Sequence, residues 1–372
     1  MASAQDHLDV AVVGGGPVGL ACAWRAARRG LRATVVDAGE PGAWHVAAGM
    51  LAPVAEAEFG ERALLELGLR SAAMFEDFCA ELAEASGEDP GLRASGTLVV
   101  ARDADEAEAL DRLIAFRETF GLHIERLRPS QARRLEPALA PTVRLALDVA
   151  GDHSIDPRRL VAALREAVEI RRGRAAALRV EDDRVTGVEL EDGSTVGAGA
   201  VVVAAGAHAE RLGMPEAARV PVRPVKGQVL RLRDPRGPGL VTRVIRGEQA
   251  YLVPRGDGRY VLGATMEERG WDTAATAGGV YELIRDMSEV VPGVLELEID
   301  ELEAGLRPAT PDNLPAIGRG ALEGLIWAAG HHRNGILLTP VTAELVAGAL
   351  AGEPPPDWAG PADPARFAGV PA

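Results

Sequence analysis

The sequence predicts an α/β protein, α+β overall, in which a Rossmann-like nucleotide-binding domain is interleaved with an antiparallel-sheet substrate domain. Three buried strands that lead into glycine lie far apart, at residues 8–13, 200–205 and 325–329. Between the last two, apolar residues recur with a period close to two, which is typical of antiparallel strands. One nucleotide-binding domain built from separated segments explains this order better than two domains in succession.

The expected domains are therefore discontinuous. The nucleotide-binding domain is predicted to comprise residues 1–85, 140–220 and 305–352, and the substrate domain residues 86–139 and 221–304. The Pro-rich segment 353–372 is expected to be a loose end.

The first βαβ unit is the clearest local signal. A β-branched run at 8–13, an Ala-rich helix at 18–29 closed by Gly30, and a strand at 32–36 follow one another directly. Further helices are expected at residues 62–85, 104–120, 157–169, 276–291 and 340–350. Further strands are expected at residues 96–101, 177–181, 184–190, 195–196, 229–232, 242–246, 250–254 and 260–264.

Composition argues against several classes of function. The chain of 372 residues has a formal net charge of −15, which disfavours binding to nucleic acid or to an anionic membrane surface. No apolar run reaches about 18 residues and no signal-peptide pattern opens the chain, so a cytoplasmic protein is expected. Only two cysteines occur, Cys22 and Cys79, and we expect both to be small buried side chains. Neither a disulfide framework nor a metal site is predicted.

A dinucleotide-binding fingerprint joins the first strand to the first helix. Its G-x-G-x-x-G segment consists of Gly14, Gly16, Pro17, Val18 and Gly19, with one residue between the first two glycines. The glycines permit the tight turn, the approach of a pyrophosphate and close helix–strand packing. Asp37 ends the next strand, where an acidic side chain binds a ribose hydroxyl. A glycine turn without a ligand is the alternative, and the motif alone does not separate FAD from NAD.

Residues 44–53, Trp-His-Val-Ala-Ala-Gly-Met-Leu-Ala-Pro, resemble the flavin-contacting loop of the glycine oxidase (ThiO) branch of the FAD-dependent D-amino-acid oxidase family. Further similar segments lie at residues 155–160, 202–207, 251–255, 263–266, 305–312 and 330–337. The resemblance spans roughly residues 8 to 350. It implies non-covalently bound FAD, a two-domain fold and amine oxidation.

The resemblance also implies the residues that contact FAD. Small residues after the second strand would pack on the flavin ring, the strand around Ala177 would lie near the adenine, and a helix beginning at Asn334 would direct N–H groups at the flavin's pyrimidine oxygens. The expected cofactor residues beyond the fingerprint are Ala47, Ala48, Gly49, Met50, Ala177, Ala205, Gly206, Arg333, Asn334, Gly335 and Ile336. Without the resemblance, a close-packed loop and an ordinary buried strand remain alternatives.

Arg307 is the main candidate for binding the substrate. It precedes Pro308, so we expect a rigid turn to fix its direction, and a guanidinium grips a carboxylate through two parallel hydrogen bonds. The family's carboxylate-binding tyrosine corresponds to Tyr251, and Arg333 corresponds to an arginine near substrate and flavin. A solvated arginine and a core tyrosine are the alternatives.

The resemblance places Met50, Ala52 and Met266 in the pocket wall, where methionines would narrow the pocket in favour of small amines. Gln249 stands where some members have histidine, which leaves the substrate preference open. The pair Trp44-His45 is similar to the Trp-His of dimethylglycine dehydrogenases, whose histidine is joined covalently to flavin. The spacing here is one residue longer, which favours an unmodified loop histidine.

The expected function is FAD-dependent oxidative deamination of glycine, sarcosine or a small D-amino acid. Hydride would pass to flavin N5 and O2 would be reduced to H2O2, with a role in thiamine thiazole synthesis. The alternatives are a D-amino-acid dehydrogenase with a non-oxygen acceptor, a non-catalytic flavin-binding subunit and an NAD-dependent dehydrogenase. The partners expected are the amine and O2, without nucleic acid or membrane, and the sequence leaves open whether the protein forms a homo-oligomer.

Overall fold

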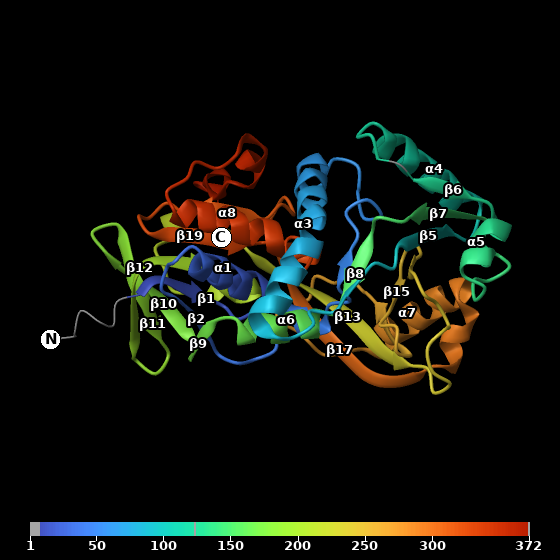
Figure 1. Cartoon of the computed structure of the whole chain (residues 1–372), viewed down its shortest axis with the longest axis horizontal. Coiled ribbons are helices and arrows are strands. Elements are labelled where there is room, and N and C mark those ends of the chain that lie inside the picture. The colour runs from blue at the N-terminus through green and yellow to red at the C-terminus, as the bar shows by residue number, and fades with distance from the viewer. Residues whose placement is uncertain (1–7, 123, 371–372) are drawn as a thin grey trace.

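A computed structural model describes residues 8–122 and 124–370, which form two lobes (Figure 1). The lobe on the left of the figure contains β1, β2, β12 and β19, with α1 and α8 packed on them. The lobe on the right contains β5, β7 and β15 with α4 and α7. Among the described helices, none has the length and apolarity needed to cross a lipid bilayer.

The first sheet brings together strands from three distant parts of the chain. β1 (Leu8–Val13) lies between β2 (Ala33–Asp37) and β12 (Thr195–Val203), and all three run parallel. The outer strands of this sheet are β9 (Glu169–Arg172), β10 (Ala175–Glu181), β11 (Arg184–Leu190), β18 (Ala316–Arg319) and β19 (Leu325–Ala329). The predicted α/β class is confirmed.

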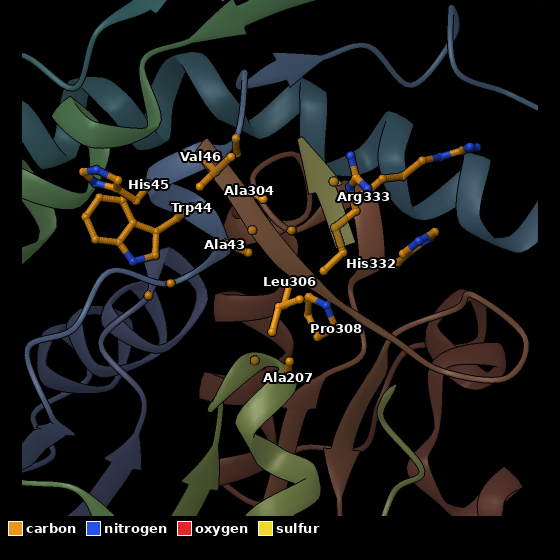
Figure 2. Close-up of a pocket in the computed structure, with 18 of the residues that line it drawn as sticks. Ala43, Trp44, His45, Val46, Ala207, Ala304, Leu306, Pro308, His332 and Arg333 are labelled. Atoms are coloured by element: carbon orange, nitrogen blue, oxygen red, sulfur yellow. The ribbon is translucent and has the colours of Figure 1, made fainter. Parts of the chain in front are cut away.

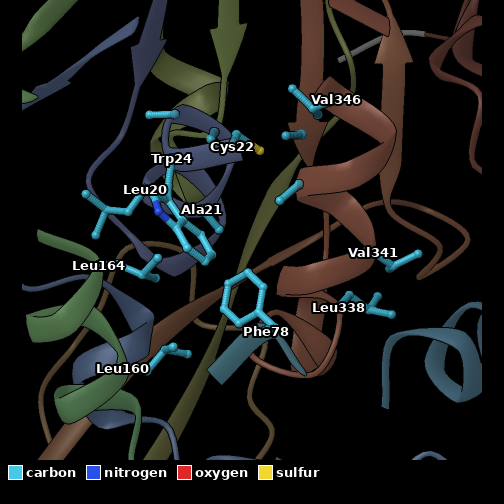
Figure 3. Packing of buried hydrophobic residues seen from close by; sticks show 14 of the residues in the cluster. Leu20, Ala21, Cys22, Trp24, Phe78, Leu160, Leu164, Leu338, Val341 and Val346 are labelled. Atoms are coloured by element: carbon cyan, nitrogen blue, oxygen red, sulfur yellow. The ribbon is translucent and has the colours of Figure 1, made fainter. Parts of the chain in front are cut away.

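Four helices cover one face of this sheet and enclose an apolar core (Figure 3). They are α1 (Pro17–Arg28), α3 (Arg62–Ser86), α6 (Pro157–Glu166) and α8 (Thr339–Leu350). The indole of Trp24 meets the ring of Phe78 edge-on, with 5.2 Å between ring centroids. Cys22 and Cys79 are both buried free thiols, as predicted, and burial raises the pKa of Cys79 to about 12.

The second sheet is mainly antiparallel and has the spatial order β17-β13-β16-β15-β14-β5-β7-β6. Its strands are β5 (Thr97–Ala101), β6 (Glu125–Leu127), β7 (Leu145–Val149), β13 (Arg223–Arg233), β14 (Val244–Arg246), β15 (Tyr251–Pro254), β16 (Arg259–Gly263) and β17 (Glu298–Ala309). The helices of this lobe are α4 (Ala104–Glu118), α5 (Pro129–Leu135) and α7 (Ala277–Val290).

A small sheet and several short helical turns connect these parts. The small sheet has the order β3-β8-β4 and consists of β3 (Met50–Leu51), β4 (Leu92–Arg93) and β8 (His153–Ile155). The short turns are α2 (Ala43–Val46), η1 (Gly206–Arg211), η2 (Glu216–Ala218), η3 (Pro292–Glu296) and η4 (His332–Asn334).

Several element boundaries differ from the prediction. Residues 195–203 form one strand, because the first half of β12 pairs with β11 and the second half with β1. The predicted helix 157–169 ends at Glu166, since residues 169–172 pair with β2 as the edge strand β9. The long strand β17 and the strands β6, β7 and β18 were not predicted. Their alternation is weak, and in β17 it is broken by acidic residues.

The prediction of a loose C-terminal end is wrong for residues 353–370. Two 3₁₀ turns, η5 (Asp357–Ala362) and η6 (Pro364–Phe367), pack onto the first lobe with Ala362 and Phe367 buried. Arg366 binds Asp312 at 2.9 Å. A few apolar side chains are enough to dock a segment that Pro-rich composition alone would leave free.

Replacing Phe78 by alanine should lower the free energy of unfolding by about 3–5 kcal/mol, because the side chain is only 1% exposed and its loss leaves a cavity. Urea unfolding with saturating FAD measures the change. Phe59→Ala is the matched control, since Phe59 is 60% exposed. Equal losses for the two variants would contradict the assignment of the core.

Candidate active site

One large cavity lies where the carboxyl ends of the parallel strands face the second sheet. Its volume is about 1630 Å³, and the glycine turn, the loop at 43–50 and the inner strands of the second sheet line it (Figure 2). The carboxyl edge of a parallel sheet is where ligands bind in doubly wound folds. The two lobes therefore contribute to the same chamber.

The glycine turn has the close contacts that a dinucleotide site needs. A Cβ added at Gly14 would overlap the carbonyl of Ala204, and one added at Gly19 would overlap the carbonyl of Gly14. Gly16 begins α1 without a side-chain cap, and the first turn of that helix holds no acidic residue. Its N–H groups are therefore free to face a pyrophosphate, and the turn fits FAD. Gly14, Gly16, Pro17 and Val18 all line the cavity.

Asp37 lies at the end of β2 and lines the cavity, as the fingerprint predicts. Its carboxylate accepts a hydrogen bond from Arg165 of α6, a partner that the sequence pattern did not indicate. At the predicted adenine end, Ala205 and Gly206 line the cavity. Ala177 does not, because its backbone pairs with β11 and with Gly213, and its neighbours Ala175 and Ala176 take that position.

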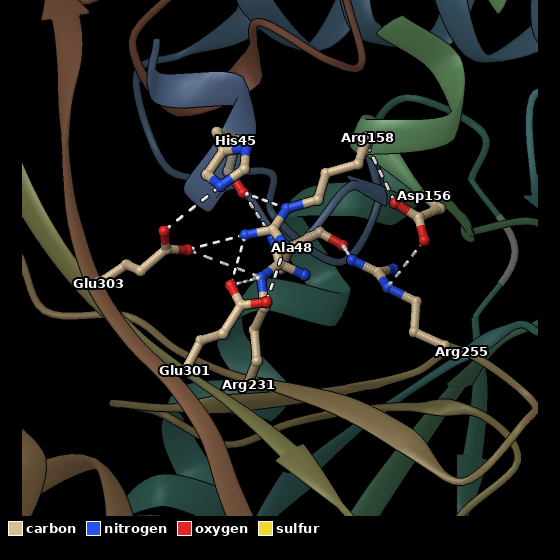
Figure 4. A network of polar contacts seen from close by, with 8 residues as sticks. All are labelled: His45, Ala48, Asp156, Arg158, Arg231, Arg255, Glu301 and Glu303. Carbon is tan, nitrogen blue, oxygen red and sulfur yellow. Dashed lines mark hydrogen bonds and ion pairs between the residues drawn. The ribbon is translucent and has the colours of Figure 1, made fainter. Parts of the chain in front are cut away.

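The loop that resembles a flavin-contacting segment is held from behind by three arginines (Figure 4). Arg231 and Arg158 donate to the carbonyl of His45 at 2.6 and 3.1 Å, and Arg255 donates to the carbonyl of Ala48 at 2.7 Å. Ala47, Ala48, Gly49 and Met50 line the cavity. Because Arg231 and Arg255 belong to the second sheet's lobe, that lobe fixes the loop of the first.

The same network surrounds the His45 ring. Its Nε2 lies 3.4 Å from a carboxylate oxygen of Glu303. Glu301 and Glu303 are bound in turn by Arg158, at 2.6 and 2.9 Å, and hydrogen bonding to Arg158 holds the pKa of Glu301 at about 2. Burial, followed by the charge of Arg158, lowers the pKa of His45. The cluster of His45 with two carboxylates is thus an ion-pair network in which arginines supply the positive charge.

Arg307 points into the cavity from β17, so the prediction that a turn carries it is wrong. The residue is paired in register with Val225 of β13. Its guanidinium donates to the carbonyls of Thr265, at 3.0 Å, and Lys226, at 3.3 Å. Within residues 8–122 and 124–370 it forms no salt bridge, so its charge is held in place without being neutralised. A Cβ on Gly227 would overlap this guanidinium, which explains the glycine at that position.

Tyr251 lies beside Arg307, as the resemblance implied. It is the first residue of β15 and lines the cavity, and the charge of the Arg307 guanidinium acts on its hydroxyl. A Cβ on Gly263, directly opposite in β16, would lie 2.6 Å from the hydroxyl oxygen. Burial raises the pKa of Tyr251, although Arg307 opposes the shift, so the hydroxyl keeps its proton. Arg307 and Tyr251 therefore form a pair of donors.

Arg333 lines the cavity, but acidic partners already hold its guanidinium. It binds Glu58 at 2.9 Å and Glu61 at 3.0 Å, and it donates to the carbonyl of Glu56 at 3.2 Å. Burial lowers the pKa of Arg333, yet the charges of these three glutamates raise it overall. It is therefore a weaker candidate than Arg307 for binding a substrate anion.

The segment after Arg333 departs from the prediction in part. Residues 332–334 form a 3₁₀ turn and α8 begins only at Thr339, so no helix starts at Asn334. Gly335 and Ile336 line the cavity, whereas Asn334 is buried behind them. His332 faces the cavity near Pro308 (Figure 2), and burial followed by the charge of Arg307 lowers its pKa to about 4. It is therefore neutral at pH 7.

The pocket wall is more open than predicted. Met50, Gln249 and Met266 line the cavity, but Met266 is 65% exposed and Gln249 is also exposed, so they border an open side. Ala52, the fourth residue predicted for the pocket wall, does not line the cavity. It follows the end of β3, and its side chain is fully buried against Val99 and its neighbours. Sequence reasoning also missed Arg246 and Glu56, which line the cavity and carry no motif that would reveal them.

Two buried charged residues, Asp152 and Arg117, bind the backbone of the loop at residues 53–58. This loop includes Glu56 and Glu58, which line the cavity. Asp152 accepts the N–H groups of Val54 and Ala55, at 3.3 and 2.5 Å, and burial raises its pKa to about 7. Arg117 donates to the carbonyls of Ala55 and Ala57, at 3.0 and 3.2 Å. The loop is thus anchored on both its N–H and its carbonyl side.

The family model, the sequence relatives and the solved structures that match this chain all point to FAD-dependent oxidoreductases. Residues 9–349 match the family model described as FAD dependent oxidoreductase. The chain is 36% identical to a glycine oxidase of Geobacillus kaustophilus, over 91% of this chain and 92% of the relative. It is similar to a crystal structure of glycine oxidase from that organism with a TM-score of 0.90 and 32% identity, covering 96% of this chain and 98% of the other.

A second kind of relative is longer. The chain is 34% identical to a bifunctional protein ThiO/ThiG of Synechocystis, over 92% of this chain and 51% of the relative. The chain thus spans about half the length of that bifunctional protein.

Replacing Arg231 by methionine should weaken FAD binding at least about tenfold, or ~1.4 kcal/mol, because the His45 carbonyl loses a charged donor. Titration of the apoprotein with FAD, followed by fluorescence quenching, measures the change. Arg233→Met is the control, since Arg233, two residues further along the same strand, is exposed and pairs with Glu298. Unchanged affinity in the Arg231 variant would remove the arginines from the account of the loop.

The pKa of Asp152 predicts a loss of stability as pH rises. The folded protein keeps this carboxyl protonated up to about pH 7, whereas the unfolded chain releases the proton near pH 3.9. The contribution is present below pH 3.9 and is lost as pH rises through 7, with a slope of up to about 1.4 kcal/mol per pH unit. Urea unfolding between pH 5 and 8 should show a flatter profile for Asp152→Asn. A profile as steep as that of wild type, or as that of the exposed control Asp111→Asn, would refute the assignment.

Proposed function

The chain belongs to the FAD-dependent oxidoreductase family and is an FAD-dependent amino acid oxidase of the glycine oxidase type, and we propose that its substrate is glycine or another small amine, such as sarcosine or a small D-amino acid. The observation that carries the proposal is the pair formed by Arg307 and Tyr251. A cation that has no acidic partner among the described residues and a protonated hydroxyl point into one cavity. Together they suit the carboxylate of a small amino acid.

The residues of the chain orient the substrate. Arg307 and Tyr251 bind the two oxygens of the carboxylate, which fixes the direction of the adjacent α-carbon. The carbonyls of Thr265 and Lys226 hold the guanidinium so that little reorganisation is needed when substrate binds. His332 stays neutral and adds no further positive charge next to the amine.

The cavity fits the pyrophosphate and the isoalloxazine ring of FAD. The uncapped start of α1 would face the pyrophosphate, and Ala47 to Met50 would provide a wall for the ring. When bound, FAD would supply a hydride acceptor for the α-carbon and would allow the electrons to pass to O2, which gives H2O2. Arg231, Arg158 and Arg255 keep the loop that contacts it in one conformation.

We extend the proposal to thiamine thiazole synthesis. Its support is the similarity to the bifunctional protein ThiO/ThiG, half of whose length this chain matches. Oxidation of glycine gives an imine, which is a reactive unit that a following biosynthetic step can capture before water hydrolyses it.

Arg307→Ala tests the proposal directly. The KM for glycine should rise at least about 100-fold, or ~2.7 kcal/mol, because the carboxylate loses its bidentate partner. FAD affinity should be unchanged. Oxygen uptake at varied glycine concentration measures the KM, and Arg333→Ala should have a smaller effect because Glu58 and Glu61 already bind that side chain. An unchanged KM in the Arg307 variant would refute the clamp.

A further inference from the structure

A second arginine, Arg246, faces the same chamber as Arg307. Arg246 is the last residue of β14 and lies directly opposite Tyr251 of β15. Residues directly opposite in an antiparallel pair project to the same face of the sheet. Arg246 lines the cavity, and its side chain is 21% exposed. Tyr251 thus has Arg307 on one side and Arg246 on the other.

The guanidinium of Arg246 is poorly satisfied by the protein. Among the residues that the structure describes, it makes no hydrogen bond, and its nearest acidic group is Glu56, with 3.9 Å between Nε and the carboxylate oxygen. That separation is too long for a hydrogen bond. Arg333, in contrast, has two carboxylates within 3.0 Å. The donors of Arg246 are therefore available to a ligand.

The surroundings add positive charge next to Arg246. Arg117 lies close enough for the charge of Arg246 to contribute to lowering the Arg117 pKa, after the larger effect of burial. Asp152, the other buried group beneath this loop, has its pKa raised by burial to about 7 and is only partly ionised at neutral pH. Near Arg246, two guanidiniums thus meet the carboxylate of Glu56 and the partly protonated Asp152, while Glu58 is held by Arg333. An anion bound there would be attracted.

We propose that Arg246 binds a second carboxylate, so that the substrates of this protein include small amines with two carboxylates. This inference rests on the proposed function, because Arg307 and Tyr251 hold the first carboxylate. The second would lie on the nitrogen substituent, as in iminodiacetate, or on the side chain, as in D-aspartate. The open side bordered by Met266 and Gln249 leaves room for the larger molecule.

The test compares matched pairs of amines. Anaerobic reduction of the bound flavin is measured with glycine against iminodiacetate and with D-alanine against D-aspartate, for wild type, Arg246→Met and Arg246→Lys. For at least one pair, the ratio of kcat/KM for the dicarboxylate over the monocarboxylate should fall at least tenfold in Arg246→Met and less in Arg246→Lys. Which pair responds tells where the second carboxylate lies. Ratios that stay constant for both pairs would overturn the proposal.

Two further variants sharpen the result. Glu56→Gln removes the neighbouring acid and should raise the ratio for the responding pair. Arg259→Met removes one positive charge from an exposed position on β16, outside the cavity, and should leave both ratios unchanged. An equal fall in Arg259→Met and Arg246→Met would show a general charge effect and overturn the assignment to Arg246.

Binding without turnover separates this proposal from the proposed function. In thiodiacetate and methylthioacetate, sulfur replaces the amine, so neither is expected to reduce flavin. Perturbation of the flavin absorbance should give wild type at least tenfold tighter binding of thiodiacetate, and Arg246→Met should lose that preference. Equal binding of the two analogues by wild type would overturn the second-carboxylate site even if glycine is oxidised. Failure of all four amines to reduce flavin would instead overturn the proposed function.

Discussion

The structure depends on one electrostatic arrangement, a guanidinium held inside a cavity by carbonyl groups alone. Arg307 donates to the carbonyls of Thr265 and Lys226 and has no acidic partner among the described residues. Carbonyl dipoles fix the direction of the side chain but leave its charge uncompensated, so a carboxylate is the natural ligand. The geometry requires two glycines, Gly227 beneath the guanidinium and Gly263 beneath the Tyr251 hydroxyl.

The two lobes are joined by the same kind of interaction. Arg231 and Arg255 reach from the second sheet's lobe to the carbonyls of His45 and Ala48 in the first. The loop that we propose contacts the flavin is therefore held by the lobe that carries the proposed substrate-binding pair, Arg307 and Tyr251. Under the proposed function, this coupling would place ring and substrate relative to each other through backbone carbonyls.

The sequence allowed much of the fold to be predicted because its local signals are strong. The strand at 8–13, the glycine turn and the helix after it are fixed by local chemistry, and they were found nearly residue for residue. β17 was missed because its acidic residues, Glu298 to Glu303, pair with arginines and carry no apolar alternation. The C-terminal turns were missed because a Pro-rich composition does not indicate that single apolar residues, such as Phe367, pack onto the rest of the protein.

In the site too, residues within motifs were predicted and residues without a motif were missed. Arg307, Tyr251 and the fingerprint glycines Gly14 and Gly16 were indicated by motif, and they line one cavity. Arg246 lies in a short strand without a motif, and only its register opposite Tyr251 reveals it. Ala52 was misplaced because it follows the end of β3 and packs against Val99, a contact that no local pattern indicates. Arg333 could not be ranked from sequence, since its acidic partners lie some 270 positions away.

The most direct measurement of the central claim is the binding of acetate, a bare carboxylate, to the FAD-loaded protein. Perturbation of the flavin absorbance reports occupancy of the chamber without turnover. Saturable binding by wild type that is lost in Arg307→Met and weakened in Tyr251→Phe is the predicted result. Equal acetate affinity in wild type and Arg307→Met would contradict the account.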